Sequence, residues 1–298
     1  MAELKKISWI GCGKVGRTLA KALQHAGYET ASVICRTAES ARKAVQFIGA
    51  GNPTRDLQET LESCSVHFIT SNDDAIQGIV DQILEVSQAD LREHYFFHTS
   101  GTVNSTILEP LAKKGAYVAS IHPLQVFADP VKAVETLPGI YYAIEGGDKA
   151  MALAVQIVDH LHGKLLLIPT GRKVLYHVAG VFAANYLMVL IDLALHIMQD
   201  LGETQEDAFD AFLPLMVGAL QNVETLGVGE ALTGPIARGD SETIKRHLDA
   251  LETLRPEIGE IYRTLGQEAV KIALRSGKIT PKKGQELVKT LNVKETVH

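Results

Sequence analysis

A glycine-rich turn near the start of the chain has the residue types and spacing to cradle a phosphate group. Its six residues are Gly11, Cys12, Gly13, Lys14, Val15 and Gly16. In such a turn the first glycine permits a tight bend, the second lets backbone approach a pyrophosphate, and the third lets helix and strand pack closely. The helix that follows offers free N–H groups and the positive end of its dipole. Between an apolar run and a helical pattern, the turn predicts a dinucleotide site rather than a glycine turn without a ligand.

The second predicted strand ends in a basic residue where many dinucleotide sites carry an acid. An NAD site commonly has Asp or Glu about 20 residues past the glycines, bound to the ribose 2′-hydroxyl. Here the run 32–35 is followed by Arg36 and Thr37. Arg36 can pair with a 2′-phosphate and Thr37 can donate a hydrogen bond, so the sequence favours NADP(H) over NAD(H). Two alternatives stay open: Arg36 is a solvated strand-end residue, or a later strand end lets Glu39 serve NAD(H).

Polar loops after further strands should border the same crevice, because ligands of open parallel sheets bind beyond the carboxyl ends of the strands. Ser71 and Asn72 lie in one such loop, and Ser100 and Gly101 lie in the next. We expect these four residues to contact the dinucleotide. The alternative is that these loops, the acids at 73 and 74 among them, only cap the helices that follow.

A third loop carries His122, Pro123 and, two residues on, Gln125. A histidine at a strand end in the crevice can position a substrate or donate a proton, and the alternative is a packing role. We expect Gln125 to contact the substrate from the same loop.

One long apolar helix carries a group of polar residues near its start. Lys173 and His177 are one turn apart and project from nearly the same face, and Asn185 follows two turns later. A hydride delivered to a carbonyl or imine leaves charge that needs a proton donor and a hydrogen-bond clamp. These residues are therefore catalytic candidates, with Lys173 as the acid/base. The alternatives are a solvated first-turn lysine and a helix–helix contact for Asn185.

A loop punctuated by glycine and proline, residues 232–240, lies between two later helices. Thr233 and Arg238 are candidate substrate contacts there, with Arg238 paired to a carboxylate. The alternative is a structural loop in which Asp240 or Ser241 caps the next helix. No metal is expected, since His94 and His98 on one strand would lie about 13 Å apart.

The elements that must position these residues divide the chain in two. Residues 1–169 alternate short apolar runs with amphipathic segments, which predicts a mostly parallel, doubly wound α/β sheet of the Rossmann type. The predicted strands are 7–10, 30–35, 66–70, 95–98, 117–121, 141–144 and 164–168. Residues 170–298 predict an all-helical domain that carries candidate substrate contacts. Its first helix runs over 173–201, and a second begins at Thr204 with a kink at Pro214; another is capped by Ser241, and two more follow 255 and 281.

Composition narrows the class of protein. The net charge of −6 gives no general attraction to nucleic acid or anionic lipid. Three cysteines without a C-x-x-C pair argue against a disulfide framework and fit a reducing, cytoplasmic compartment. The apolar run 178–198 is long enough to span a bilayer, but it contains Asn185, Asp192 and His196, and we expect a helix buried inside a soluble protein instead.

With these motifs placed, nearly the whole chain resembles one family. The residues that carry the resemblance are the glycine turn, Arg36-Thr37, the run 120–125, Lys173 with Tyr176-His177 and Asn185, and above all 232–240. The family is that of Rossmann-like proteins with a C-terminal helical domain of unknown function, described as predicted NADP-dependent oxidoreductases. More distantly the chain is similar to ketopantoate reductase, pyrroline-carboxylate reductase, the hydroxyisobutyrate and phosphogluconate dehydrogenases, and prephenate dehydrogenase.

The resemblance implies a homodimer built around the apolar helix 178–198. In the hydroxy-acid dehydrogenases a lysine acid/base on this helix is followed four residues later by asparagine. Lys173 matches that lysine, whereas His177 stands in place of the asparagine.

The resulting hypothesis is an NADP-dependent oxidoreductase. Its substrate would be a small, carboxylate-bearing carbonyl, hydroxy acid or imine. The rival hypothesis is a non-catalytic NADP(H)-binding sensor, since the unmatched His177 also suits a repurposed site. A deazaflavin–NADP reductase would need a further cofactor site, which the sequence does not indicate.

Overall fold

The computed structural model describes residues 5–87 and 91–292. The chain divides into two compact units, Met1–Leu187 and Met188–His298. The predicted boundary between 169 and 170 follows directly after the last strand and stays a prediction. Each unit is described by itself.

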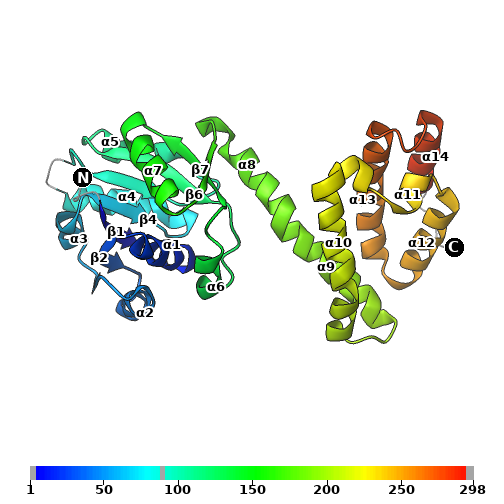
Figure 1. The fold of residues 1–298 in the computed structure, drawn as a ribbon, viewed down its shortest axis with the longest axis horizontal. Coiled ribbons are helices and arrows are strands. Elements are labelled where there is room, and N and C mark those ends of the chain that lie inside the picture. Colours follow the sequence, from blue (N-terminus) through cyan, green and yellow to red (C-terminus); the bar gives the residue numbers. More distant parts are fainter. Residues whose placement is uncertain (1–4, 88–90, 293–298) are drawn as a thin grey trace. The chain divides into compact units, whose positions relative to one another are not determined.

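The first unit is built on one eight-stranded sheet in the order β3-β2-β1-β4-β5-β6-β7-β8 (Figure 1). All neighbouring strands are parallel except β6 and β7, which are antiparallel. This confirms the mostly parallel Rossmann-type sheet. The strands are β1 (Lys6–Ile10), β2 (Glu29–Ile34), β3 (Asn52–Thr54), β4 (Val66–Ile69), β5 (Tyr95–His98), β6 (Tyr117–Pro123), β7 (Tyr141–Gly146) and β8 (Lys164–Leu167).

Helices cover both faces of this sheet, and each face has its own core of buried apolar side chains. One core includes Leu19 and Leu23 of α1 with Ile157 of α7, and the other includes Val80 and Ile83 of α4. The helices are α1 (Lys14–His25), α2 (Ala38–Ile48), α3 (Leu57–Ser63), α4 (Asp73–Val86), α5 (Glu109–Ala112), α6 (Pro130–Glu135) and α7 (Asp148–His160), with 3-10 turns η2 (Ser105–Leu108) and η3 (Thr170–Arg172).

Most predicted strands end within one or two residues of the observed ones. The short edge strand β3 lacks the apolar alternation that predicts strands, because its residues Asn52, Pro53 and Thr54 are largely exposed. Strand β6 runs on to Pro123, so His122 lies within a strand rather than in a loop beyond it.

The predicted continuous α-helix over 173–201 is wrong. The segment consists of α8 (Lys173–Gly180), one π-helical turn η4 (Val181–Asn185) and α9 (Tyr186–Asp200). A π turn holds an extra residue, so positions after it are rotated relative to an unbroken α-helix. The apolar periodicity of the sequence does not encode that extra residue. The turn changes the helix face on which Asn185 lies, and its sharing of a site with Lys173 and His177 stays a prediction.

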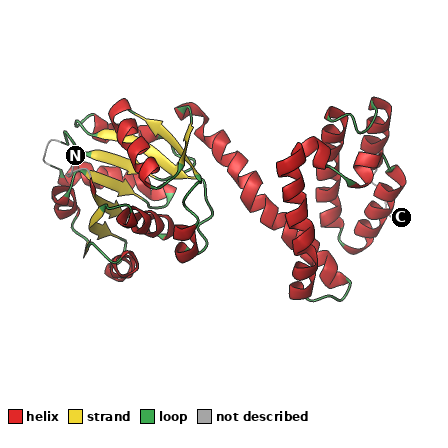
Figure 2. Cartoon of the chain, in the orientation of Figure 1, coloured by secondary structure: helices red, strands yellow, loops and turns green. Residues whose placement is uncertain are grey.

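The second unit contains helices and no strand among its described residues (Figure 2). After most of α9 come α10 (Gln205–Ala231), α11 (Gly234–Arg238), α12 (Ser241–Leu254), α13 (Pro256–Arg275) and α14 (Pro281–Asn292). Thr204 caps α10 as predicted by accepting a hydrogen bond from the Asp207 N–H. The cap of α12 is Asp240 rather than Ser241, and the non-helical residue inside α10 is Gly227 rather than Pro214. The backbone of Gly227 has φ of 76°, which glycine adopts without a steric penalty.

The prediction that the apolar helix is buried inside the protein is also wrong. Along α9 only Leu195 is buried; Met188 and Leu190 are exposed, as is Phe182 in the π turn before it. The segments Thr170–Asp200 and Gln205–Ala231 are both long and apolar enough to cross a membrane, by length and composition alone. Hydrophobicity alone does not say what covers a helix, and among the described residues almost none of those in these two segments is buried.

Candidate active site

The glycine turn has the close packing that its sequence predicts. Gly11 has φ of 80°, and a β-carbon added there would lie 2.7 Å from the backbone nitrogen of Ser71. The Gly11 N–H donates to the Ile34 carbonyl at 2.8 Å, which ties the turn to β2. A β-carbon at Gly16 would collide with the Thr70 hydroxyl. These positions accept only glycine, because β4 and the turn after it lie directly against them.

The beginning of α1 fits a bound phosphate. Gly13 is exposed and precedes the helix, no side chain caps the first N–H groups, and the first turn carries no acid. A β-carbon at Gly13 would meet nothing closer than the Gly11 carbonyl oxygen at 3.9 Å, so the backbone here is open to a ligand. Lys14 is exposed and Val15 half-buried, whereas Cys12 is buried. Free amides at a helix N-terminus are an anion site.

The end of β2 carries an unengaged cation. Arg36 is exposed and forms no ion pair within the described residues. The nearest acid, Glu39, is held by Lys43 at 2.5 Å, and that contact lowers the Glu39 pKa. Thr37 accepts a hydrogen bond from the Ser40 N–H at 3.1 Å and so caps α2. Arg36 is therefore available for a phosphate, while the Thr37 hydroxyl already has a structural role.

The loops after β4 and β5 meet each other. The Thr102 hydroxyl donates to the Asp73 carboxylate at 2.5 Å. The Ser100 hydroxyl accepts hydrogen bonds from the N–H groups of Thr102 and Val103. Asn72 precedes α4 without a side-chain capping bond, and Ser71 packs on Gly11. Ser71 and Asn72 thus border the glycine turn, whereas the Ser100 hydroxyl organises its own loop.

Two histidines converge on Gly101. A β-carbon at Gly101 would lie 2.5 Å from Nδ1 of His177 and 2.8 Å from Nε2 of His122, so only glycine leaves room for both rings. The rings are edge to face at 6.1 Å between centroids. On its other side, His122 Nδ1 lies 2.9 Å from the hydroxyl of Tyr176. Burial, then the charge of Lys173, lowers the His122 pKa to about 4, so the ring is neutral near pH 7.

Lys173 is buried, with 2% of its surface exposed, so it is not the solvated first-turn residue of the alternative interpretation. Its ammonium donates to the Ser120 hydroxyl and lies 3.5 Å from Glu145. Burial lowers the Lys173 pKa to about 8, although the Glu145 carboxylate opposes that shift. The buried Glu145 also accepts hydrogen bonds from the Ser105 N–H at 2.7 Å and from the Thr170 hydroxyl at 3.0 Å.

Strand register explains why these groups meet. His98, Ser120 and Glu145 are direct neighbours across β5, β6 and β7. Ser120 and His122 are two residues apart on one strand face, a rise of about 6.6 Å. Lys173 and His177 are one helical turn apart, a rise of about 6 Å. The two spacings match, and α8 therefore sets Lys173 against Ser120 and His177 near His122.

The other predicted site residues are not brought into this cluster. Asn185 is exposed on the π turn, and the Gln125 amide donates to the Thr136 hydroxyl at 2.6 Å. Thr233 and Arg238 are exposed in the second unit. Their contacts with substrate stay predictions. Within residues 5–87 and 91–292, no group of three His, Cys, Asp or Glu side chains is arranged to hold a metal ion.

Sequence reasoning missed Tyr176 and Glu145 as site residues. Both left a trace in the sequence. Glu145 is an acid that directly follows the apolar residues of a strand, and Tyr176 immediately precedes His177 on the candidate helix. Neither trace identifies a partner, because the partners come from other strands.

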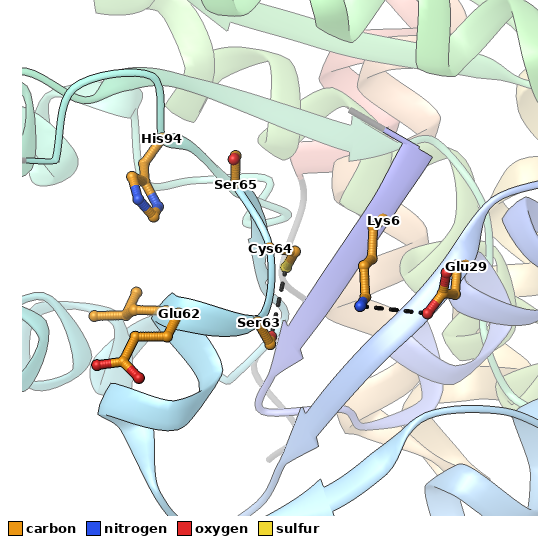
Figure 3. A pocket seen from close by; sticks show the side chains of 8 residues that line it. Lys6, Glu29, Glu62, Ser63, Cys64, Ser65 and His94 are labelled. Carbon is orange, nitrogen blue, oxygen red and sulfur yellow. Dashed lines mark hydrogen bonds and ion pairs between the residues drawn. The ribbon is translucent and has the colours of Figure 1, made fainter. Parts of the chain in front are cut away.

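A separate pocket of about 510 Å³ lies at the opposite edge, where β1, β2 and β4 begin (Figure 3). It is lined by Lys6, Glu29, Leu61, Glu62, Ser63, Cys64, Ser65 and His94. Behind it the buried His67 bonds His94 at 3.0 Å and Ser8 at 2.7 Å. Because ligands of such sheets bind at the carboxyl ends of the strands, this pocket is not part of the candidate active site.

Two family models match the chain in succession. The Rossmann-like domain matches residues 2–123, and a domain of unknown function, DUF2520, matches residues 140–269. The chain thus carries a Rossmann-like domain followed by a DUF2520 domain, which confirms the resemblance drawn from the sequence. The second match begins just before β7, so it includes Glu145, Lys173 and Tyr176.

Known proteins of similar sequence or structure include oxidoreductases, reductases and a reductive aminase. Pyrroline-5-carboxylate reductase 3 from Bos taurus is 26% identical over 120 residues, which are 40% of this chain and 38% of that protein. A predicted NADP oxidoreductase from Bacteroides fragilis is 24% identical, with 91% of this chain and 99% of that chain covered and a TM-score of 0.73. A reductive aminase from Aspergillus terreus, in complex with NADPH and ethyl-5-oxohexanoate, is 17% identical, with coverage of 96% and 92% and a TM-score of 0.62.

Proposed function

We propose that this chain, a Rossmann-like domain joined to a DUF2520 domain, is an NADP-dependent oxidoreductase that reduces a carbon–oxygen or carbon–nitrogen double bond in a small carboxylate-bearing substrate, or oxidises the corresponding product. The single observation that carries the proposal is the convergence of ring nitrogens of His122 and His177 on Gly101, in the loop that follows β5. The glycine turn lies at the same carboxyl edge of the sheet as this loop. Structures similar to the whole chain include complexes with NADPH.

Residues of the first unit would hold the cofactor. The open amides at the start of α1 suit the pyrophosphate, and Ser71 and Asn72 border that turn. Arg36, exposed and unpaired at the end of β2, suits a 2′-phosphate. When bound, NADPH supplies a hydride, and the protein's own groups must supply the proton and orient the substrate.

Replacing Arg36 with alanine is expected to weaken NADPH binding about 10- to 100-fold, because a charge-assisted hydrogen bond to phosphate is lost. NADH binding should hardly change. Trp9 is the only tryptophan and lies two residues before Gly11, so its fluorescence reports the titration. Arg55→Ala, at another exposed arginine, is the control. Equal affinities for NADPH and NADH in the wild type would remove the assignment of Arg36.

For the reacting end we propose His122 as the group that contacts the substrate, with His177 beside it. Lys173, the acid/base expected from the sequence, is buried and already contacts Ser120 and Glu145, so its direct contact with a substrate stays a prediction. Burial, and after it the charge of Lys173, lowers the His122 pKa and keeps that ring neutral near pH 7. Asn185, Gln125, Thr233 and Arg238 stay candidate substrate contacts.

The test of the function is consumption of NADPH with a panel of keto acids, simple ketones and cyclic imines, and formation of NADPH with hydroxy acids. Carbonyl and imine substrates are tested separately, because a proton donor in the proposed site could serve a carbonyl oxygen or an imine nitrogen. Tight NADPH binding without turnover of any panel member would favour the rival function, a nucleotide-binding sensor.

We also propose that a second copy of this chain covers the exposed apolar helices. Exposed apolar side chains also lie on α10, where Leu215, Leu220 and Leu226 are each more than half exposed. Large exposed apolar surfaces mark interaction sites. A second copy presents the same chemistry to itself, and the soluble sheet domain on the same chain argues against a bilayer as the occupant.

Wild-type protein is therefore expected to sediment as a dimer at micromolar concentration, and Leu220→Glu is expected to shift it to monomer. A buried unpaired charge costs several kcal/mol, enough to move the dissociation constant by orders of magnitude. Val131→Glu, on the exposed side of α6, is the control and should stay dimeric. A monomeric wild type would exclude the dimer, and partitioning of wild type into lipid vesicles would indicate a membrane instead.

A further inference from the structure

We propose that Tyr176 is a positioning residue that fixes the tautomer of His122 and resupplies its proton, so that the pair forms a relay from solvent to the substrate. The inference rests on the proposed function, because it deepens the role of His122 in that site. It is carried by three observations: the bond between Tyr176 and His122, the direction of the free ring nitrogen, and the charges around the ring.

The first observation is the bond itself. The Tyr176 hydroxyl lies 2.9 Å from His122 Nδ1, and the two rings meet edge to face at 5.6 Å between centroids. Burial raises the Tyr176 pKa to about 12, so the hydroxyl keeps its proton near pH 7 and can donate it to Nδ1. A neutral imidazole carries one ring proton, and which nitrogen holds it is set by the hydrogen bond at the other. Donation from Tyr176 therefore leaves the proton on Nε2.

The second observation is the direction of Nε2. This nitrogen points at Gly101, on the loop after β5, and has no hydrogen-bond partner among the described residues. Tyr176 is only half-buried, so its hydroxyl connects the inner ring to solvent. From outside to inside, the proton relay then consists of solvent, Tyr176, His122 and the position at Gly101.

The third observation is the charge around the ring. The groups that act on His122 are Lys173, from behind Ser120, and His177 on α8, which both disfavour the imidazolium, and Asp73 of α4, which favours it. The Asp73 carboxylate is engaged by Thr102. His122 thus starts neutral and cannot act as a preformed cationic acid, which is why a second proton source is needed.

The proton transfer balances as follows. When the substrate carbon gains a hydride, its oxygen or nitrogen gains the bonding electron pair and takes the proton from Nε2. The Nε2–H bond breaks while Nδ1 gains the proton of the Tyr176 hydroxyl, so the imidazole remains neutral in its other tautomer. The resulting tyrosinate takes a proton from a water molecule, and the hydroxide left behind is neutralised by bulk solvent, so that the reduction consumes one solvent proton for each hydride. In the oxidative direction each transfer reverses.

The experiment combines spectroscopy with kinetics on the full chain. In protein labelled with ¹⁵N-histidine, long-range ¹H–¹⁵N spectra give the protonation state of each ring nitrogen, and the His122→Gln variant identifies the His122 signals. We expect Nε2 protonated and Nδ1 unprotonated in the wild type, and a mixture of tautomers in Tyr176→Phe. A wild-type ring protonated on Nδ1 would overturn the relay.

The kinetic arm uses whichever panel substrate turns over. Tyr176→Phe should lower kcat at least 10-fold and change its pH profile, while the affinity for NADPH stays within twofold of wild type. The matched control is Tyr141→Phe, which removes a hydroxyl from an exposed tyrosine on β7 and should leave kcat unchanged. Wild-type kcat and pH profile in Tyr176→Phe would contradict the relay. Absence of any turnover in the wild type would count against the proposed function, and the tautomer spectra would still decide whether Tyr176 sets the state of His122.

Discussion

Replacing Glu145 with alanine is expected to lower the free energy of unfolding of the first unit by about 3 to 5 kcal/mol, the usual cost of breaking a buried ion pair. The carboxylate is 4% exposed and joins three parts of the chain: Ser105 of η2, Thr170 of η3 and Lys173 of α8. Its removal leaves the Ser105 N–H without its acceptor and the Lys173 ammonium buried without a counter-charge.

Urea unfolding followed by Trp9 fluorescence measures this loss, because Trp9 lies in β1 and reports the first unit. The matched control is Glu29→Ala, which breaks the exposed ion pair with Lys6 and should cost no more than about 1 kcal/mol. The double variant Glu145→Gln with Lys173→Met should regain most of the stability, since both charges leave together. Equal losses in Glu145→Ala and Glu29→Ala would show that the buried network does not stabilise the fold.

Acidification is expected to destabilise the first unit steeply, because three of its histidines are buried in the neutral form. Burial lowers the pKa of His67 and of His98 to about 3, and of His122 to about 4. In the unfolded chain the pKa of each histidine is about 6.5. Between these values the unfolded chain binds protons that the folded chain does not, so stability is present above about pH 6.5 and is lost as the pH falls toward 4.

Each such histidine contributes about 1.4 kcal/mol per pH unit, and the three together about 4 kcal/mol per pH unit between pH 6 and 4.5. Urea midpoints measured across that range test the slope. Carboxylates add to it in every variant, so the informative quantity is the difference between variants. His122→Gln should reduce the slope by about one third of the histidine contribution, whereas His25→Gln, at an exposed position on α1, should not change it. An unchanged slope in His122→Gln would mean that the folded ring titrates normally.

Local sequence pattern was enough to predict the sheet, but not the contacts that join Glu145, Lys173 and Ser120. The glycine turn and strands such as β5 are encoded by neighbours in sequence, because turn geometry and apolar periodicity are local properties. The contact of Glu145 with Lys173 depends instead on β7 lying antiparallel to β6, which places Ser120 opposite Glu145. No periodicity in either strand specifies that register. Sequence reasoning therefore selected Lys173 as an unusual lysine but could not identify Ser120 and Glu145 as its partners.

The same limit applies to His122 and Tyr176. The sequence marked His122 by its position at a strand end and His177 by its helix face. The hydroxyl that bonds His122, however, belongs to Tyr176, the residue just before His177 on the helix. Helical periodicity gave Lys173 and His177 a common side, but the pairing with His122 follows from the equal rise of one helical turn and two strand residues. The apolar run 178–198 was predicted from its hydrophobicity to be buried. Hydrophobicity alone does not say which molecule covers such a helix.

The π turn at Val181–Asn185 lets this helix tolerate a change in length. The turn holds one residue more than an α-helical turn, so loss of a single codon there would restore an unbroken α-helix and leave the later residues of α9 on nearly the same face. Loss of a single codon within α9 itself would instead rotate every later residue by about 100° and present a different stripe of side chains. Lys173, Tyr176 and His177 precede both places, so the outward surface can diverge in descendants of this chain without a change in these groups.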